Sequence, residues 1–267
     1  MIALEDDARS AVKVLRWWWL VAISFVIGLI ALAPAALLER VMPADSPVRL
    51  ATEAGTIWNG RGRVSVLTDS TPLIVPVAWR FDPTALLRLR VGFHVIADGP
   101  AIVGTTRLGL RTGSIELRDT AVNAEARVLS TAHRLAAVFA PQGKLRLQQG
   151  NGESLTIGFP RNAEGFWRID GAMGLHVEKF VLGGVVNAAV GSHEIVLQGA
   201  ATTVNFSIPR SSGALKLEGA GSLTLAQPRR FTFSGFATAA NDAPASLKQL
   251  GAALPDGRQR LEINTPW

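Results

Sequence analysis

The feature that most constrains this chain is a long succession of short segments in which apolar and polar residues alternate. It begins near residue 50 and continues to the end, as in Val91–Val95, Leu155–Phe159 and Val204–Ile208. Gly, Asn, Asp and Pro interrupt it about every ten residues, which is typical of antiparallel strands joined by tight turns. Successive side chains of a strand point to opposite faces, so one face should be apolar and the other polar. The sequence therefore predicts a mainly β, antiparallel domain of many short strands over residues 51–267.

A few short helices are expected to interrupt these strands. Asp82–Pro83 begins the first, because Asp caps helices and Pro suits the first turn. Ser130–Thr131 begins the second, which ends at Pro141. Pro244 begins the third, which ends before Pro255. Each is too short to form a separate helical layer.

Two local patterns predict a turn and an edge. Asn59–Gly60 favours a two-residue type I′ hairpin turn, because both residues tolerate positive φ, with Trp58 buried beside it. A role for Trp58 in binding a partner is the alternative. The Pro72–Pro76 stretch predicts an edge strand or the strand that enters the sheet, because each proline removes one backbone donor from the ladder.

Residues 17–38 carry no charge, a run of 22 residues. As a helix, this run is long enough to cross the ~30 Å apolar layer of a bilayer. Arg16, Trp17, Trp18 and Trp19 lie where an interfacial aromatic belt is expected. We expect a retained transmembrane anchor. A cleaved signal peptide and a buried core helix are the alternatives.

The bases around this run predict its orientation. Arg9, Lys13 and Arg16 precede it closely, whereas only Arg40 and Arg49 follow at similar distance. Bases favour the cytoplasmic side, so the N-terminus should be cytoplasmic and the bulk of the chain on the other side. The expected divisions are a cytoplasmic tail (residues 1–16), the anchor (17–38), a linker (39–50) and the β-rich domain (51–267).

Composition limits the possible chemistry. The 267 residues include no Cys, which excludes disulfides, thiolate metal sites and a cysteine nucleophile. The formal net charge is +6, but the bases are scattered, so no nucleic-acid partner is expected. Apolar residues make up 48% of the chain, enough for a sizeable buried surface.

No motif predicts an active site. No pair of the four histidines has metal-ligand spacing, and His94, His176 and His193 are expected on the sheet surface. Phosphate-binding loops, a nucleophile elbow and a paired acid and base are all absent from the sequence. We predict no catalytic, cofactor-binding or metal-binding residues and no cofactor. An enzyme acting on envelope polysaccharide is disfavoured because no carboxylate pair is evident.

Several motifs in order resemble protein N of the bacterial type II secretion system. A Gly-Thr-x-Trp-Asn-Gly motif comes first, then a Trp-x-Phe-x-Pro segment leading into a leucine-rich helix, and last a helix, an Asp-Gly turn and a strand. The matching residues are Gly55, Thr56, Trp58, Asn59 and Gly60, then Trp79, Phe81, Pro83 and Ala85–Leu87, and last Leu247–Ile263.

The resemblance implies an accessory component of the bacterial inner membrane, spanning it once, with a periplasmic β-rich domain. It also implies a part in the export of folded proteins and other inner-membrane secretion components as partners. No enzymatic residue carries over from this family. The expected mechanism is therefore scaffolding through exposed sheet edges or basic faces.

A second function remains open. Short amphipathic strands behind one anchor also resemble periplasmic lipid-handling proteins of the AsmA type, in which a curved sheet holds acyl chains, and phospholipid would then be a partner. The side chains that could line such a groove are Phe159, Phe166, Val204, Phe206, Phe231 and Phe233. Alternatively these side chains only contact one another or a helix. The sequence does not decide between a sandwich, a barrel and an open groove.

Overall fold

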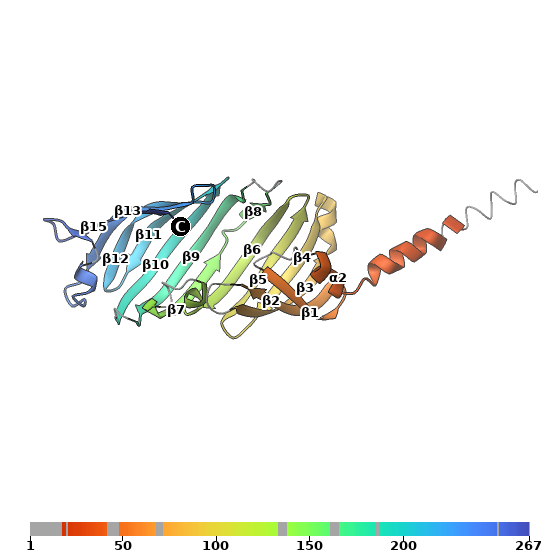
Figure 1. Cartoon of the computed structure of the whole chain (residues 1–267), viewed down its shortest axis with the longest axis horizontal. Helices are drawn as coiled ribbons and strands as arrows, with labels where there is room; N and C mark the ends of the chain where they lie inside the picture. Colours follow the sequence, from red (N-terminus) through yellow and green to blue (C-terminus); the bar gives the residue numbers. More distant parts are fainter. Residues whose placement is uncertain are drawn as a thin grey trace, which may run out of the picture.

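The strands form one long sheet that follows the order of the chain. The computed structural model describes residues 18–19, 21–41, 48–67, 72–132, 138–160, 166–184, 187–249 and 251–266. Each strand is antiparallel to its neighbours, from β1 (Val48–Gly55) at one end to β15 (Gln259–Pro266) near the other (Figure 1). The prediction of a mainly β, antiparallel fold is confirmed.

Thirteen further strands lie between or beside these two. They are β2 (Asn59–Val66), β3 (Leu73–Asp82), β4 (Val91–Asp98), β5 (Ile102–Arg111), β6 (Ser114–Glu125), β7 (Pro141–Gln148), β8 (Ser154–Gly158), β9 (Arg168–Leu182), β10 (Ala188–Ala200), β11 (Thr203–Ser212), β12 (Leu215–Thr224), β13 (Arg230–Ala239) and β14 (Ala252–Ala253). β7 and β8 share one place in the sheet, because both lie between β6 and β9. The short β14 pairs with β15 at the end of the sheet.

Cross-strand pairs divide the side chains between two faces, since directly opposed residues share a face. Pairs on one face, the apolar face, include Leu50 with Val64, Leu108 with Leu117, Leu145 with Val177, Leu197 with Phe206, Leu223 with Phe231, and Phe233 with Ile263. Pairs on the other, the charged face, include Arg80 with His94, Arg107 with Arg118, Asn123 with Arg146, Glu194 with Arg210, and Phe236 with Arg260. The expected alternation therefore extends from one end of the sheet to the other.

All fifteen described strands belong to one sheet, whose order runs from β1 to β14 without closing on itself. Near the β15 end, a buried cluster does cover the apolar face, and η2 (Leu247–Gln249) contributes to it. Its buried members are Ala188, Val190, Leu215, Ala237, Ala243 and Leu247. In the middle of the sheet most apolar side chains are only partly buried, although Met173 and Val177 of β9 are buried on this face. Of the three arrangements that the sequence left open, the structure has the open sheet.

Short helices occur where the sequence predicts them, with shifted bounds. η1 (Pro83–Arg88) is a 3₁₀ helix, and Asp82 caps it by accepting a 3.0 Å hydrogen bond from the Thr84 N–H. α3 (Val128–Ala132) begins two residues before the expected start at Ser130. Residues 133–137 and 250, within the second and third predicted helices, lie outside the described residues.

An N-terminal helix projects from the β1 end of the sheet (Figure 1). Residues 18–19 and 21–31 are helical, and α2 (Ala36–Val41) follows a bridge that pairs Pro34 with Thr56. Trp18 and Trp19 are exposed. Within the described part of the chain, no helix is both long enough and apolar enough to cross a membrane. Arg16, Trp17, residue 20 and linker residues 42–47 lie outside the described residues.

Two local predictions were wrong. Asn59–Gly60 is not a turn but the start of β2, and the positive φ of this hairpin belongs to Gly55, at 100°. The Pro72–Pro76 stretch is not at an edge, because β3 lies between β2 and β4. Pro76 is tolerated there because pairing with β4 begins only at Val77, so no β4 residue is paired with the proline.

Leu247 should be a main source of stability at the β15 end, because its side chain is fully buried. We expect Leu247→Ala to lower the free energy of unfolding by about 3 kcal/mol, from lost burial and a residual cavity. Leu87→Ala is the control, since Leu87 is 88% exposed. Urea unfolding of both variants measures the difference. Equal midpoints would contradict the covering role of η2.

Candidate functional site

The first family motif forms the joint between the N-terminal helix and the sheet. The Gly55 carbonyl accepts a 3.1 Å hydrogen bond from the Ala35 N–H, and the Ile57 N–H donates to the Ala33 carbonyl at 3.0 Å. Ala33 and Ala35 are buried. Backbone hydrogen bonds therefore fix the end of the helix to the loop between β1 and β2.

Trp58 lies at the point where the helix meets the apolar face. Its indole N–H donates to the Ile30 carbonyl at 2.7 Å. Its ring packs edge-on against Phe81, with centroids 4.9 Å apart, and Phe81 packs in the same way against Phe93 at 6.0 Å. Phe81 and Phe93 are paired on the apolar face. An aromatic row thus leads from the helix onto the sheet.

The other motif residues give this joint its shape. A Cβ on Gly55 would lie 2.3 Å from the Asn59 carbonyl oxygen, and one on Gly60 would lie 2.6 Å from the Trp79 ring. Thr56 Oγ1 accepts hydrogen bonds from the N–H groups of Trp58 and Asn59. The two positions therefore require glycine because larger residues would collide.

The second motif contributes to both faces of the sheet. Trp79 is buried on the apolar face, and its indole N–H donates to the Ile57 carbonyl at 3.2 Å. Pro83 instead begins η1, which packs closely over the charged face. A Cβ on Gly92 of that face would lie 2.4 Å from the Cβ of Ala85 in η1. The structure brings Trp79 together with the first motif and places Pro83 apart from it.

An aromatic cluster occupies the apolar face near the β15 end. Phe206 stacks with Phe231 and Phe233, with centroids 5.6 and 6.0 Å apart, and Val204 lies on the same face. These four residues were expected to share a face, and they do. They contact one another, and their outer surface remains partly exposed.

The remaining two predicted groove residues lie at the connection between β8 and β9. Phe159 and Phe166 are 37% and 40% exposed, and Phe159 packs edge-on against Trp167 at 5.5 Å. Beside them is a cavity of about 190 Å³ with a mostly apolar lining. Its lining residues are Ile157, Trp167, Ile169, Leu225 and Arg229.

His193 corrects a sequence expectation. It was expected on the surface, but it is buried on the apolar face, paired with Val177 of β9. Its Nδ1 lies 2.8 Å from the Ser211 hydroxyl. Burial lowers its pKa, so the imidazole is neutral at pH 7. A neutral ring is compatible with this face, whereas a charged one is not.

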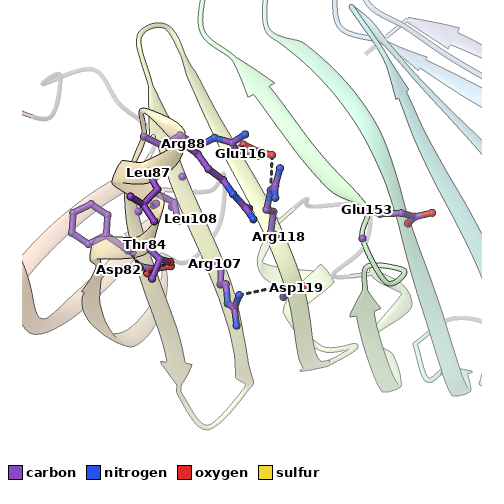
Figure 2. A pocket seen from close by; sticks show the side chains of 16 residues that line it. Asp82, Thr84, Leu87, Arg88, Arg107, Leu108, Glu116, Arg118, Asp119 and Glu153 are labelled. Carbon is purple, nitrogen blue, oxygen red and sulfur yellow. Dashed lines mark hydrogen bonds and ion pairs between the residues drawn. The ribbon is translucent and has the colours of Figure 1, made fainter.

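The charged face holds a cavity of about 390 Å³ beneath η1 (Figure 2). Its lining includes Arg88, Arg90, Arg107 and Arg118 together with Asp82, Glu116, Asp119 and Glu153. The four bases balance the four acids. This cavity therefore has no net preference for an anion or a cation.

Glu116 is the most buried acid of this cavity. Arg118 Nε donates to one carboxylate oxygen at 2.6 Å, and Arg90 donates to the other. Burial alone would raise the pKa of Glu116, but the hydrogen bonds and charges of Arg118 and Arg90 outweigh it and lower that pKa. Glu116 is thus ionised at neutral pH with both oxygens bonded, so it is poorly suited to act as a general acid.

Metal-binding chemistry also lacks a centre in the described residues. No three His, Asp or Glu side chains there lie close enough to hold a metal ion. Sequence reasoning missed the Arg90, Glu116 and Arg118 cluster, because these residues come from a loop and a strand 26 positions apart. The only signal was a set of charges at polar-face positions, which did not show which charges meet.

The fold and these surfaces define a class of protein with one open sheet, an apolar face and a projecting N-terminal helix. A family model described as type II secretion system (T2SS), protein N matches residues 46–262. The chain therefore belongs to the type II secretion system protein N family. No curated protein and no solved structure matches it.

Glu116→Gln should destabilise the β4–β6 region, because it leaves Arg90 buried without its charge partner. We expect a loss of about 3 kcal/mol in the free energy of unfolding. Glu53→Gln is the control, since Glu53 and Arg63 form an exposed pair, which contributes about 0.5 kcal/mol. Urea unfolding at pH 7 measures both variants. Equal losses would contradict the role of burial.

The same cluster predicts a pH dependence. The pKa of Glu116 is lower in the folded chain than in the unfolded chain, so its stabilisation is present above the unfolded value of 4.5 and is lost as the pH falls through the folded value. Glu116→Gln should therefore lose less stability than the unchanged chain between about pH 5 and pH 3. If both chains lost the same free energy of unfolding over this pH range, groups other than Glu116 would control the response to acid.

Proposed function

We propose that this protein is an accessory inner-membrane component of a type II secretion system, acting as a non-enzymatic periplasmic scaffold in the export of folded proteins. The family match over residues 46–262 carries this proposal. The helix places the sheet at the membrane surface, and the sheet offers its edge to other secretion components. The chain itself performs no reaction in this mechanism.

The N-terminal helix supports a membrane anchor. Residues 21–31 contain no charge, and most of their large apolar side chains, including Phe25 at 65%, are exposed. Exposed apolar side chains all round a helix are stable against lipid and unfavourable in water. Arg9, Lys13 and Arg16 at its start favour a cytoplasmic N-terminus and a periplasmic sheet.

The charged face supports the proposal that water surrounds the sheet. It carries exposed ion pairs between neighbouring strands, such as Arg107 with Asp119 at 3.3 Å and Arg146 with Glu178 at 3.5 Å. Such pairs contribute little to stability but keep a surface soluble. A sheet in the periplasm would direct this face toward water.

The two ends of the sheet differ in their ability to accept a partner strand. At β1, the Glu39 carboxylate of α2 accepts hydrogen bonds from the backbone N–H and the hydroxyl of Thr52. At the other end, β14 pairs only with Gln259 and Arg260, so no described strand lies beyond residues 261–266. An unpaired edge can bind an extended partner segment through its backbone. We place the scaffold contact at this β15 edge.

A photo-cross-linking residue at Ile263 tests this contact in cells that assemble the secretion system. Ile263 is 46% exposed on β15, and the control position Ile74 is 54% exposed on the interior strand β3. We expect an inner-membrane secretion subunit to be captured at Ile263 and not at Ile74. Capture of no subunit at Ile263, or equal capture at both positions, would contradict scaffolding through this edge.

Alkaline carbonate washing of membranes tests the anchor. We expect the intact chain to remain in the membrane pellet, because about 20 apolar residues in contact with lipid do not release at high pH. Mass spectrometry of the retained chain should find residues 1–16 still present. A shortened chain released into the supernatant would instead support the cleaved signal peptide.

A further inference from the structure

The middle of the apolar face offers a ligand little except hydrocarbon. Every Asp, Glu, Lys and Arg in the paired positions of the described strands lies on the charged face. Few polar side chains lie on the apolar face. Thr106 pairs with Thr120 and His193 Nδ1 with Ser211, both at 2.8 Å, whereas the buried His193 Nε2 has no hydrogen-bond partner. Protein interfaces average roughly one hydrogen bond per 100–200 Å². A hydrocarbon ligand, in contrast, needs no hydrogen bond.

The dimensions of this face fit acyl chains laid along it. Fourteen strands lie side by side in the ordered path, and neighbouring strands are about 4.8 Å apart, so the face is roughly 60 Å long. One leaflet of a bilayer is about 15 Å of hydrocarbon. Several chains could therefore lie along the face, and each would remove apolar surface from water.

The apolar face is continuous with the apolar N-terminal helix. The helical residues 21–31 end beside Trp58, whose indole is bonded to the Ile30 carbonyl. The rings of Trp58, Phe81 and Phe93 then continue onto the sheet without an intervening charge. An acyl chain that left the lipid around the helix would meet apolar side chains from the helix to Phe93.

A mostly apolar cavity beside Trp167 adds to this face. Its volume is about 190 Å³, and Ile157 and Ile169, which line it, are paired on the apolar face. Apolar cavities of roughly 150 Å³ stay dry and bind apolar molecules. This cavity can therefore hold part of a hydrocarbon chain, with Arg229 also in its lining.

From these observations we infer that the apolar face is an open groove for the acyl chains of membrane phospholipid, which enter beside Trp58 and move along the sheet. The scarcity of hydrogen-bonding groups favours lipid over a polypeptide as the occupant, and the continuity with the helix, which rests on the proposed anchor, favours the membrane as its source. Binding depends on the sheet and the helix and does not require contact with secretion components. It shares the proposed anchor with the scaffold but stands or falls separately from the contact at the β15 edge.

Photo-cross-linking in the full chain tests the occupant. A benzophenone residue at Leu147 or Leu223, both on the apolar face, should form covalent adducts with phospholipid in cells, detected by mass spectrometry. The same residue at Gln148, the next position on β7 but on the charged face, is the matched control. Phe25 in the exposed helix is the positive control.

Two outcomes would overturn the inference. One is the absence of lipid adducts at Leu147 and Leu223 while Phe25 gives them. The other is a protein adduct at both positions, which would show that a polypeptide covers the face. Ile263 also lies on the apolar face, but on the strand at the open edge, so the Ile263 experiment is scored only by capture of a secretion subunit there.

A charge placed within the groove tests the route. Leu147→Asp should lower lipid adducts at a Leu223 probe by about tenfold while a probe at Leu108 keeps them, because an unpaired carboxylate against hydrocarbon is unfavourable. Gln148→Asp, on the charged face, should change neither. Circular dichroism of both variants checks that the sheet forms. Unchanged adducts at Leu223 in a folded Leu147→Asp variant would contradict passage from the helix end.

Discussion

The backbone ladder that joins each strand to the next is the constraint on which the rest of this structure depends. Because the strands pair in chain order, the apolar side of one strand is always beside the apolar side of its neighbours. Bulges between Thr105 and Arg107 and between Gln142 and Lys144 leave this order intact, since the pairs on both sides of each bulge keep to the same face. One apolar face, one charged face and two unlike edges all follow from this ladder.

The joint at Trp58 connects the ladder to the N-terminal helix. The family motif consists of residues with specific geometric tasks: Gly55 and Gly60 allow close approach, Thr56 bonds the turn, and Trp58 bridges the helix and the apolar face. It sets where the helix ends relative to the face, and both proposals depend on that placement.

The two faces suggest different tasks for one sheet. The charged face balances its arginines with acids, as in the cavity around Glu116, and this arrangement favours a stable, soluble surface over a selective site. The apolar face has a covered end near Leu247 and a middle in which most side chains are half-buried. Apolar surface left exposed is unfavourable in water. We therefore propose the open β15 edge for a partner strand and the apolar face for hydrocarbon.

Sequence alone predicted the features that depend on neighbouring residues: the alternation that makes strands, the Asp82 cap of η1, the sharing of one face by Phe206, Phe231 and Phe233, and the family. It did not predict that Asn59–Gly60 begins a strand, that Pro76 lies inside the sheet, or that His193 is buried. Nor did it show that Arg90 meets Glu116 or that all the described strands join one open sheet. Alternation along a strand is local, with a period of two residues, so it can be read directly. Strand order, register and the lack of a covering layer depend on contacts between distant segments, and only the tertiary structure decided those.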